Sequence, residues 1–151
     1  MRIFWVNPII KLSLRRLIIK GEENLPKDGA IIIGSNHTSA LLDPLVILRA
    51  MNSDTVFMTR ADIFRKPLLQ KVFTFLKMLP IFRIRDGIAA VKQNEEIIAK
   101  CVKVLKHRSP LALFPEATHR PKHSLLGLSK GIFHIALEAN KNFGHKCPVY
   151  I

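Results

Sequence analysis

The first residues whose types and spacing suit chemistry are His37 and Asp43, in the segment 36–43 (Asn-His-Thr-Ser-Ala-Leu-Leu-Asp). A histidine with a carboxylate partner can take a proton from a hydroxyl near neutral pH. The carboxylate fixes the tautomer and stabilises the imidazolium as it forms. The pair therefore predicts a general base, His37, oriented by Asp43. Histidine and aspartate also fall this close by chance, so a loop histidine beside a helix-capping aspartate is the alternative.

A pair of arginines, Arg83 and Arg85, stands at the end of the apolar stretch 81–84. Side chains two residues apart on a strand point the same way. The guanidinium fork binds phosphate through two parallel hydrogen bonds. Arg60 follows another apolar stretch, 55–59, in a similar way. These cations predict a phosphate site, with a solvated basic edge of a sheet as the alternative.

The segment 114–120 (Phe-Pro-Glu-Ala-Thr-His-Arg) also combines several reactive side chains. It contains Glu116, Thr118 and Arg120, and Lys130 follows shortly before an apolar, helix-like stretch. Backbone amides of such a loop, together with a lysine and a helix start, can hold a phosphate. A polar surface loop is the alternative.

Apolar stretches alternate between strand-like and helix-like patterns along the whole chain. We expect strands at 30–35, 55–59, 81–84, 111–114 and from 149, and helices at 44–51, 61–78 with an interruption at Pro67, 88–107 and 131–140. This alternation predicts an α/β fold with a mostly parallel sheet flanked by helices. Ligands of such sheets bind beyond the carboxyl ends of the strands. Because the polar segments 36–43, 83–87 and 115–130 all follow expected strands, we expect them to form one site. Asp43 is expected to cap the helix that begins at Pro44.

Composition narrows the class of protein and of partner. The chain has 151 residues, of which 48% are hydrophobic, so a disordered or disulfide-stapled chain is excluded. The formal net charge is +13, which predicts anionic partners such as nucleic acid, phosphorylated metabolites or anionic lipid. Cys101 is expected to be a core thiol, and neither it nor Cys147 has metal-ligand neighbours at useful spacing.

Residues 1–20 mix many apolar residues with basic ones. Lys11, Arg15 and Arg16 interrupt the apolar run that a signal peptide requires. We therefore expect a basic amphipathic helix on a membrane surface, followed by one partial domain at 21–151. A helix that packs on the domain with solvated charges is the alternative. No stretch is long and apolar enough to predict a transmembrane helix.

Two further features of the sequence concern the apolar segment 63–79 and the end of the chain. The apolar segment 63–79 is expected to be core, although an acyl-chain groove or, given its lysines, a membrane-facing helix are alternatives. The chain also stops at Ile151 inside an expected strand, so we expect a fragment that is incomplete at its C-terminus.

Together these residues resemble the glycerophospholipid acyltransferase family, which comprises lysophosphatidic acid and glycerol-3-phosphate acyltransferases. The family's first motif is Asn-His, four residues and Asp, and it is similar to 36–43. The second, an apolar strand ending in arginine, is similar to 81–85, and the third, Phe-Pro-Glu-Gly-Thr-Arg, to 114–120. The start of the fourth, a short apolar strand with proline, is similar to 148–151. The lead-in, a Gly-x-Glu-Asn-Leu-Pro turn, is similar to residues from 21 on, so the resemblance spans about 20–151.

Three positions depart from the family pattern. Five residues rather than four separate His37 from Asp43, Ala117 replaces glycine, and His119 is inserted before Arg120. We interpret these as traits of a bacterial subfamily.

The resemblance implies an acyltransferase in phospholipid synthesis. His37 and Asp43 would be catalytic: His37 takes the proton of an acceptor hydroxyl, and the oxygen attacks the thioester of acyl-CoA or acyl carrier protein. The implied acceptor is glycerol 3-phosphate or a lysophospholipid such as lysophosphatidate. The implied substrate-binding residues are Arg83, Arg85, Glu116, Thr118, Arg60, Arg120 and Lys130. It implies no metal and no cofactor beyond the thioester co-substrate, an anionic membrane surface as partner, no nucleic acid, and a location at the cytoplasmic face of the inner membrane.

Two other functions are weighed against this one. The first is a non-catalytic basic module that binds anionic membrane or nucleic acid, which the net charge taken alone would support. Nucleic-acid-binding proteins usually show a docking motif or aromatic residues within a basic face, and this sequence shows neither. A hydrolase using the same His–Asp pair ranks lower, because the sequence has no obvious serine nucleophile elbow.

Overall fold

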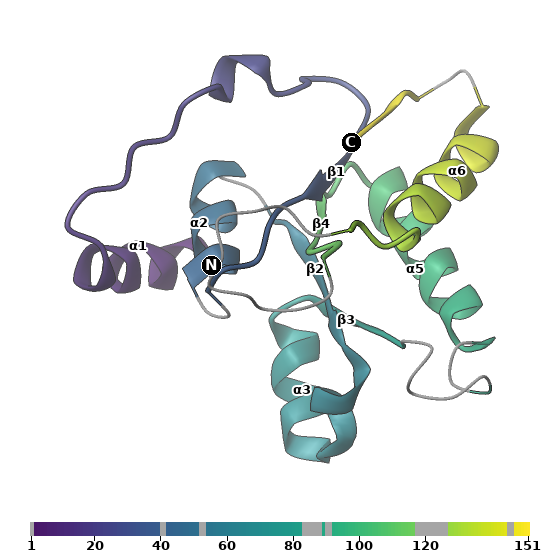
Figure 1. Cartoon of the computed structure of the whole chain (residues 1–151), viewed down its shortest axis with the longest axis horizontal. Helices are drawn as coiled ribbons and strands as arrows, with labels where there is room; N and C mark the ends of the chain where they lie inside the picture. The colour runs from purple at the N-terminus through teal and green to yellow at the C-terminus, as the bar shows by residue number, and fades with distance from the viewer. Residues whose placement is uncertain are drawn as a thin grey trace.

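A parallel sheet in the strand order β3-β2-β4-β1-β5 forms the centre of the molecule (Figure 1). The computed structural model describes residues 2–39, 42–51, 54–82, 89, 92–116, 127–144 and 147–151. The strands are β1 (Ala30–Gly34), β2 (Val56–Arg60), β3 (Met78–Ile81), β4 (Leu111–Leu113) and β5 (Val149–Tyr150). Every strand pairing among these residues is parallel. The expected α/β fold with a parallel sheet is confirmed.

Helices cover both faces of the sheet (Figure 1). They are α1 (Arg2–Ser13), α2 (Leu42–Met51), α3 (Pro67–Phe75), α5 (Asn94–Lys106) and α6 (Gly131–Phe143), with short 3-10 helices η1 (Glu22–Asn24) and η2 (Ala61–Arg65). Helices α5 and α6 pack together on one face, and α1 and α2 pack together near the other.

Alternating side chains divide the core between the two faces. On β2, Val56 and Met58 join the core under α5 and α6, whereas Phe57 between them joins the core under α1 and α2. On β4, Leu111 and Ala112 divide in the same way. This period of two is the geometry of a strand that is buried on both faces.

Several boundaries differ from the expected ones, and three of these differences change how a residue is interpreted. Helix α2 begins at Leu42, so Asp43 lies inside its first turn, and the N-cap expected at this residue is wrong. Strand β3 begins at Met78 rather than near Ile81, because Met78–Ile81 pair with Phe57–Arg60 of β2. Pro80 is compatible with this strand because β3 is at the edge of the sheet. Pro67, expected as an interruption, is at the start of α3.

The helix expected over residues 1–20 covers Arg2–Ser13. Its residues Val6 and Ile10 are buried in the same core cluster as Leu48 and Phe57, so α1 packs against the domain. Leu12 on the same helix is exposed. Among the residues described here, no helix has the length and apolar character needed to cross a membrane.

Candidate active site

Neighbouring strands bring two of the sequence motifs to one edge of the sheet. Strand β1 pairs with β4, with Gly34 opposite Leu113. The chain leaves both strands in the same direction, so His37 after β1 and Phe114 after β4 meet beyond their carboxyl ends. Strand β2, which ends at Arg60, pairs with the other side of β4. The predicted position of the site at the carboxyl ends agrees with this arrangement.

The side chains of His37 and Asp43 are in direct contact. Nδ1 of His37 lies 3.0 Å from Oδ2 of Asp43. A carboxylate oxygen accepts hydrogen bonds, so this contact leaves the ring proton on Nδ1 and the lone pair on Nε2. The two side chains keep 14% and 20% of their surface accessible, so the pair is shielded but still open to a substrate. A carboxylate that fixes the tautomer of an imidazole in this way is what a histidine general base would need.

The same carboxylate oxygen also organises the loop after His37. The backbone N–H groups of Thr38 and Ser39 donate to Oδ2 of Asp43 at 2.8 Å and 2.7 Å. The N–H of Asp43 in turn donates to the carbonyl of Ser39 at 3.2 Å. The loop thus folds around the first turn of α2, and the five-residue gap between His37 and Asp43 still permits their contact. Hydrogen bonds to a carboxylate are stronger than neutral ones, so Asp43 holds both the imidazole and the loop.

A contact that the sequence analysis did not anticipate is made by Phe114. Its ring stacks on the imidazole of His37, with ring centroids 3.8 Å apart and planes 11° from parallel. Phe114 itself packs against the core cluster beneath α1 and α2. A ring held by the core therefore sets the plane of the imidazole and covers one of its faces. The sequence feature that could have predicted this contact is the position of Phe114 at the end of a strand expected in the same sheet as the strand before His37.

Arg60, one of the predicted phosphate ligands, lies at the end of β2 and binds Asp62 in η2. Its Nε donates to Oδ1 of Asp62 at 3.1 Å, and its Nη2 donates to Oδ2. About half of the Arg60 side chain remains exposed. The guanidinium therefore shares its charge with a carboxylate that the sequence analysis did not consider.

Of the other predicted site residues, Glu116 and Lys130 are described. Glu116 follows β4 and is half-buried, and Lys130 is exposed at the N-terminus of α6. The N–H of Ser129 donates to the carbonyl of Pro115 at 2.8 Å, so the two ends of the segment between them are held together. Arg83, Arg85, Thr118 and Arg120 lie outside the described residues.

A second unanticipated arrangement is at the end of β3. The side-chain amide of Asn94, at the start of α5, forms two hydrogen bonds with the backbone of Phe82. The N–H of Phe82 donates to Oδ1 at 3.0 Å, and Nδ2 donates to the carbonyl of Phe82 at 2.8 Å. Asn94 thus continues the hydrogen bonding of the strand at the last described residue before Arg83.

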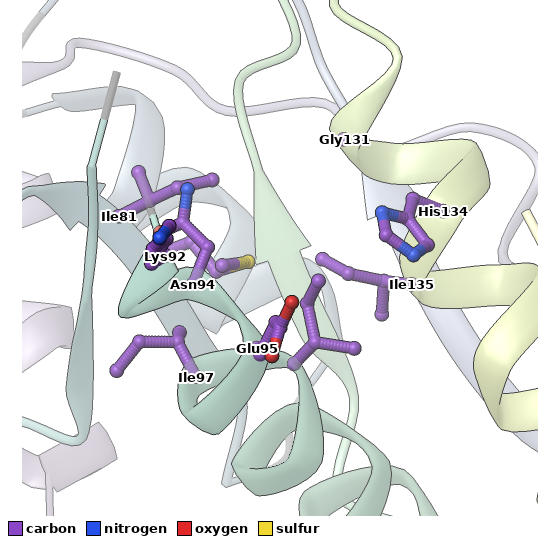
Figure 2. A pocket seen from close by; sticks show the side chains of 10 residues that line it. Ile81, Lys92, Asn94, Glu95, Ile97, Gly131, His134 and Ile135 are labelled. Carbon is purple, nitrogen blue, oxygen red and sulfur yellow. The ribbon is translucent and has the colours of Figure 1, made fainter. Parts of the chain in front are cut away.

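A pocket of about 320 Å³ lies beside Asn94, between the first turns of α5 and α6 (Figure 2). It is lined by Met58, Ile81, Lys92, Asn94, Glu95, Ile97, Ile98, Gly131, His134 and Ile135. Its apolar floor belongs to the core under α5 and α6, whereas Phe114 belongs to the core of the other face. The pocket is therefore separate from the His37–Asp43 pair. In the described ranges, no cluster of three or more His, Cys, Asp or Glu is arranged to hold a metal.

Comparisons with known proteins find similar sequences and a similar fold. A family model described as Acyltransferase matches residues 16–151. A 1-acyl-sn-glycerol-3-phosphate acyltransferase of Borreliella burgdorferi is 29% identical over 133 residues, which are 85% of this chain and 51% of the relative. The chloroplastic 1-acyl-sn-glycerol-3-phosphate acyltransferase LPAT1 of Arabidopsis thaliana is 25% identical over 122 residues, 80% of this chain and 32% of the relative. This chain thus spans about half or less of the length of these relatives.

One solved structure is also similar to this chain. It is the 1-acyl-sn-glycerophosphate acyltransferase PlsC from Thermotoga maritima, with a TM-score of 0.58 and 22% identity. The match covers 95% of this chain and 55% of that one. The likeness supports the α/β fold described above.

Proposed function

Because the chain belongs to the acyltransferase family, we propose that it forms the catalytic part of a 1-acyl-sn-glycerol-3-phosphate or glycerol-3-phosphate O-acyltransferase. The enzyme would move a fatty acyl group from a thioester to an acceptor hydroxyl in phospholipid synthesis. The observation that carries this proposal is the 3.0 Å contact between His37 Nδ1 and Asp43 Oδ2. The curated relatives, named as 1-acyl-sn-glycerol-3-phosphate acyltransferases, support the choice of reaction.

The tautomer of His37 supports the following proposed reaction. Nε2 of His37 takes the proton of the acceptor hydroxyl while the oxygen attacks the thioester carbonyl of acyl-CoA or acyl carrier protein. Asp43 stabilises the imidazolium, and Phe114 keeps the ring in plane. The imidazolium then returns its proton to the departing thiolate, so an ester and a free thiol are the products. The residues of this chain supply positioning and proton transfer.

The acceptor phosphate would be bound by cations around the carboxyl ends of the strands. We assign this role to Arg83 and Arg85 first, and to Arg60, Arg120 and Lys130 as further cations. Arg60 would exchange part of its contact with Asp62 for phosphate, since both anions compete for one guanidinium fork. Glu116 and Thr118 would orient the acceptor or the loop that follows β4.

The proposed setting of the reaction is the cytoplasmic face of the cell membrane. The acceptor is itself an amphiphile or a precursor of one, and the net charge of +13 favours an anionic lipid surface. The exposed Leu12 and Ile9 of α1 would contribute to this association.

The test is replacement of His37 by alanine in the longest encoded form of the protein. Thiol release from acyl-CoA is measured with lysophosphatidate or glycerol 3-phosphate as acceptor. Loss of a positioned general base should lower turnover by about 100-fold or more. His107→Ala, which removes an exposed histidine after α5, is the matched control and should keep full turnover. If His37→Ala keeps turnover within a factor of a few of wild type, the proposed acyltransferase function fails, and a non-catalytic basic module becomes the favoured interpretation.

A further inference from the structure

Helix α3 presents an apolar face to solvent. Leu68, Val72 and Phe75 lie at positions i, i+4 and i+7, so they form one stripe along the helix. The side chains of Leu68 and Phe75 are 73% and 74% exposed, and Val72 is 43% exposed. Single exposed apolar residues are ordinary, but a continuous stripe of large ones on one helix marks an interaction surface.

The adjacent face of the same helix is already used by the domain. Phe73 packs on Phe64 of η2, with ring centroids 5.4 Å apart, and Leu76 is half-buried. The contacts of α3 are mainly with η2 and β3. Figure 1 shows α3 beyond the β3 edge of the sheet, on the side away from α5 and α6. The stripe of Leu68, Val72 and Phe75 therefore faces outward.

The charged side chains within α3 and directly beside it in the sequence are positive. Arg65, Lys66, Lys71 and Lys77 are exposed on or beside α3. The sequence from 63 to 82 contains no aspartate or glutamate. Lys77 is bound by Asp54, whereas Lys66 at the N-cap of α3 and Lys71 within the helix have no acid in the segment 63–82. An apolar stripe flanked by lysines matches an anionic phospholipid surface in both chemistry and charge.

We propose that α3 docks the domain on anionic phospholipid, with Leu68, Val72 and Phe75 in the acyl boundary and Lys66 and Lys71 among the headgroups. The inference rests on the proposed function in one respect, that the membrane is the source of the acceptor lipid. Helix α3 follows β2 through η2, so it starts at the carboxyl edge of the sheet that also bears His37. Docking through α3 brings this edge close to the lipid.

The first experiment compares vesicle binding of wild type and variants by co-sedimentation. The vesicles are phosphatidylcholine with about one third anionic phosphatidylglycerol. Leu68→Ser with Phe75→Ser should weaken binding at least about 10-fold, because two large side chains no longer enter the acyl region. The matched control is Phe133→Ser with Leu137→Ser, an exposed i, i+4 apolar pair on α6, which should bind like wild type. Equal effects of the two pairs overturn the proposal.

Charge is tested with Lys66→Gln and Lys71→Gln. Each lysine near an anionic surface is worth about a 5-fold change in binding. The double variant should therefore bind the anionic vesicles about 25-fold more weakly and show a weaker salt dependence than wild type. Binding to pure phosphatidylcholine vesicles should not change. Unchanged binding to the anionic vesicles contradicts the proposed role of the lysines.

A direct readout places an indole in the stripe. Phe75→Trp in a Trp5→Phe background should show a blue-shifted emission and protection from acrylamide with anionic vesicles. Leu137→Trp in the same background should stay quenchable. An indole at position 75 that remains in water while the protein is bound overturns the docking mode. If the stripe instead joins two copies of this chain, the Leu68→Ser, Phe75→Ser variant loses self-association but keeps vesicle binding, which also overturns it.

Turnover with detergent-dispersed acceptor separates this inference from the proposed function. The Leu68→Ser, Phe75→Ser variant should keep that turnover while losing vesicle binding. Absence of turnover in wild type would contradict the proposed function. Vesicle binding and the emission of an indole at position 75 would still test whether α3 docks on anionic phospholipid.

Discussion

The imidazole of His37 lies flat on the ring of Phe114, with 3.8 Å between centroids and 11° between planes. The strands that precede these residues are neighbours in the sheet. The imidazole is thus held from two directions, by Asp43 at Nδ1 and by an aromatic face. Such a ring cannot tilt without losing one of these contacts.

Replacing Phe114 by leucine tests the value of the stacked ring. Leucine keeps an apolar side chain of smaller size but no flat face, so we expect kcat to fall about 3- to 10-fold, matching the worth of one aromatic pair. The acceptor KM should change little, since Phe114 positions the base. Phe143→Leu, in the core of the other sheet face, is the control for a general loss of packing. Equal kcat in wild type and Phe114→Leu would show that Asp43 alone orients His37.

Asp43→Asn separates charge from geometry. The amide oxygen of asparagine can still accept from Thr38 and Ser39, so the loop should keep its structure. The negative charge that stabilises the imidazolium is lost, so we expect kcat to fall by about 100-fold. Steady-state kinetics and thermal unfolding check the two expectations together. Asp28→Asn, at an exposed position, should change neither. A full loss of folding in Asp43→Asn would mean that the carboxylate is chiefly structural.

The order of strands and helices could be predicted because it follows from local patterns. Buried strands appear as short apolar runs, and the site motifs follow them directly, as 36–43 follows β1. The resemblance of these motifs to an acyltransferase family is confirmed by the family match. The roles assigned to His37, Asp43 and the phosphate-binding residues stay predictions.

The remaining features depend on contacts between distant segments, which residue types do not reveal. Phe114 reaches His37 only because β4 lies between β1 and β2. The carboxylate of Asp43, in the first turn of α2, accepts hydrogen bonds from two backbone N–H groups of the preceding loop. The geometry of that loop, which residue types do not reveal, makes these contacts possible. Val6 and Ile10 of α1 are buried by α2 and the sheet, so a segment expected on a membrane surface also contributes to the core.

The two cysteines should differ in reactivity. Burial raises the pKa of the Cys101 thiol to about 12, so it stays protonated at pH 8, whereas Cys147 is half-buried. Iodoacetamide at pH 8 should therefore modify Cys147 at least about 100-fold faster, since only the thiolate reacts. Peptide mass spectrometry reads both rates, and urea should equalise them. Comparable rates in the folded protein would contradict the burial of Cys101.

The same pKa shift has a consequence for stability at high pH. The unfolded thiol loses its proton above pH 9.0, but the folded thiol keeps it to about pH 12. The unfolded state is thus favoured as pH rises through this window, by about 1.4 kcal/mol per pH unit. Urea unfolding at several values between pH 8 and 11 should show a steeper decline in wild type than in Cys101→Ala. Parallel declines would refute this linkage.

Asn94 is expected to position the acceptor site from the start of α5. Its side chain satisfies both backbone groups of Phe82, the residue directly before Arg83. Asn94→Ala leaves these groups without this partner, which should cost about 1–3 kcal/mol of stability. It should also raise the acceptor KM several-fold while the thioester KM and kcat stay close to wild type, because phosphate binding is the only proposed step that uses Arg83 at this strand end.

The control for Asn94 is Asn142→Ala on α6. Asn142 donates a hydrogen bond of similar length to the carbonyl of Glu138, 2.8 Å away, but it lies on an exposed helix surface. That variant should leave both KM values unchanged. Asn94→Asp keeps the acceptor for the N–H of Phe82 but turns a second, negatively charged acceptor toward its carbonyl, so its acceptor KM should rise at least as much as in Asn94→Ala. A rise of the acceptor KM in both Asn94 variants with little change of kcat supports positioning, whereas equal losses of kcat in these two variants indicate that Asn94 acts only through folding.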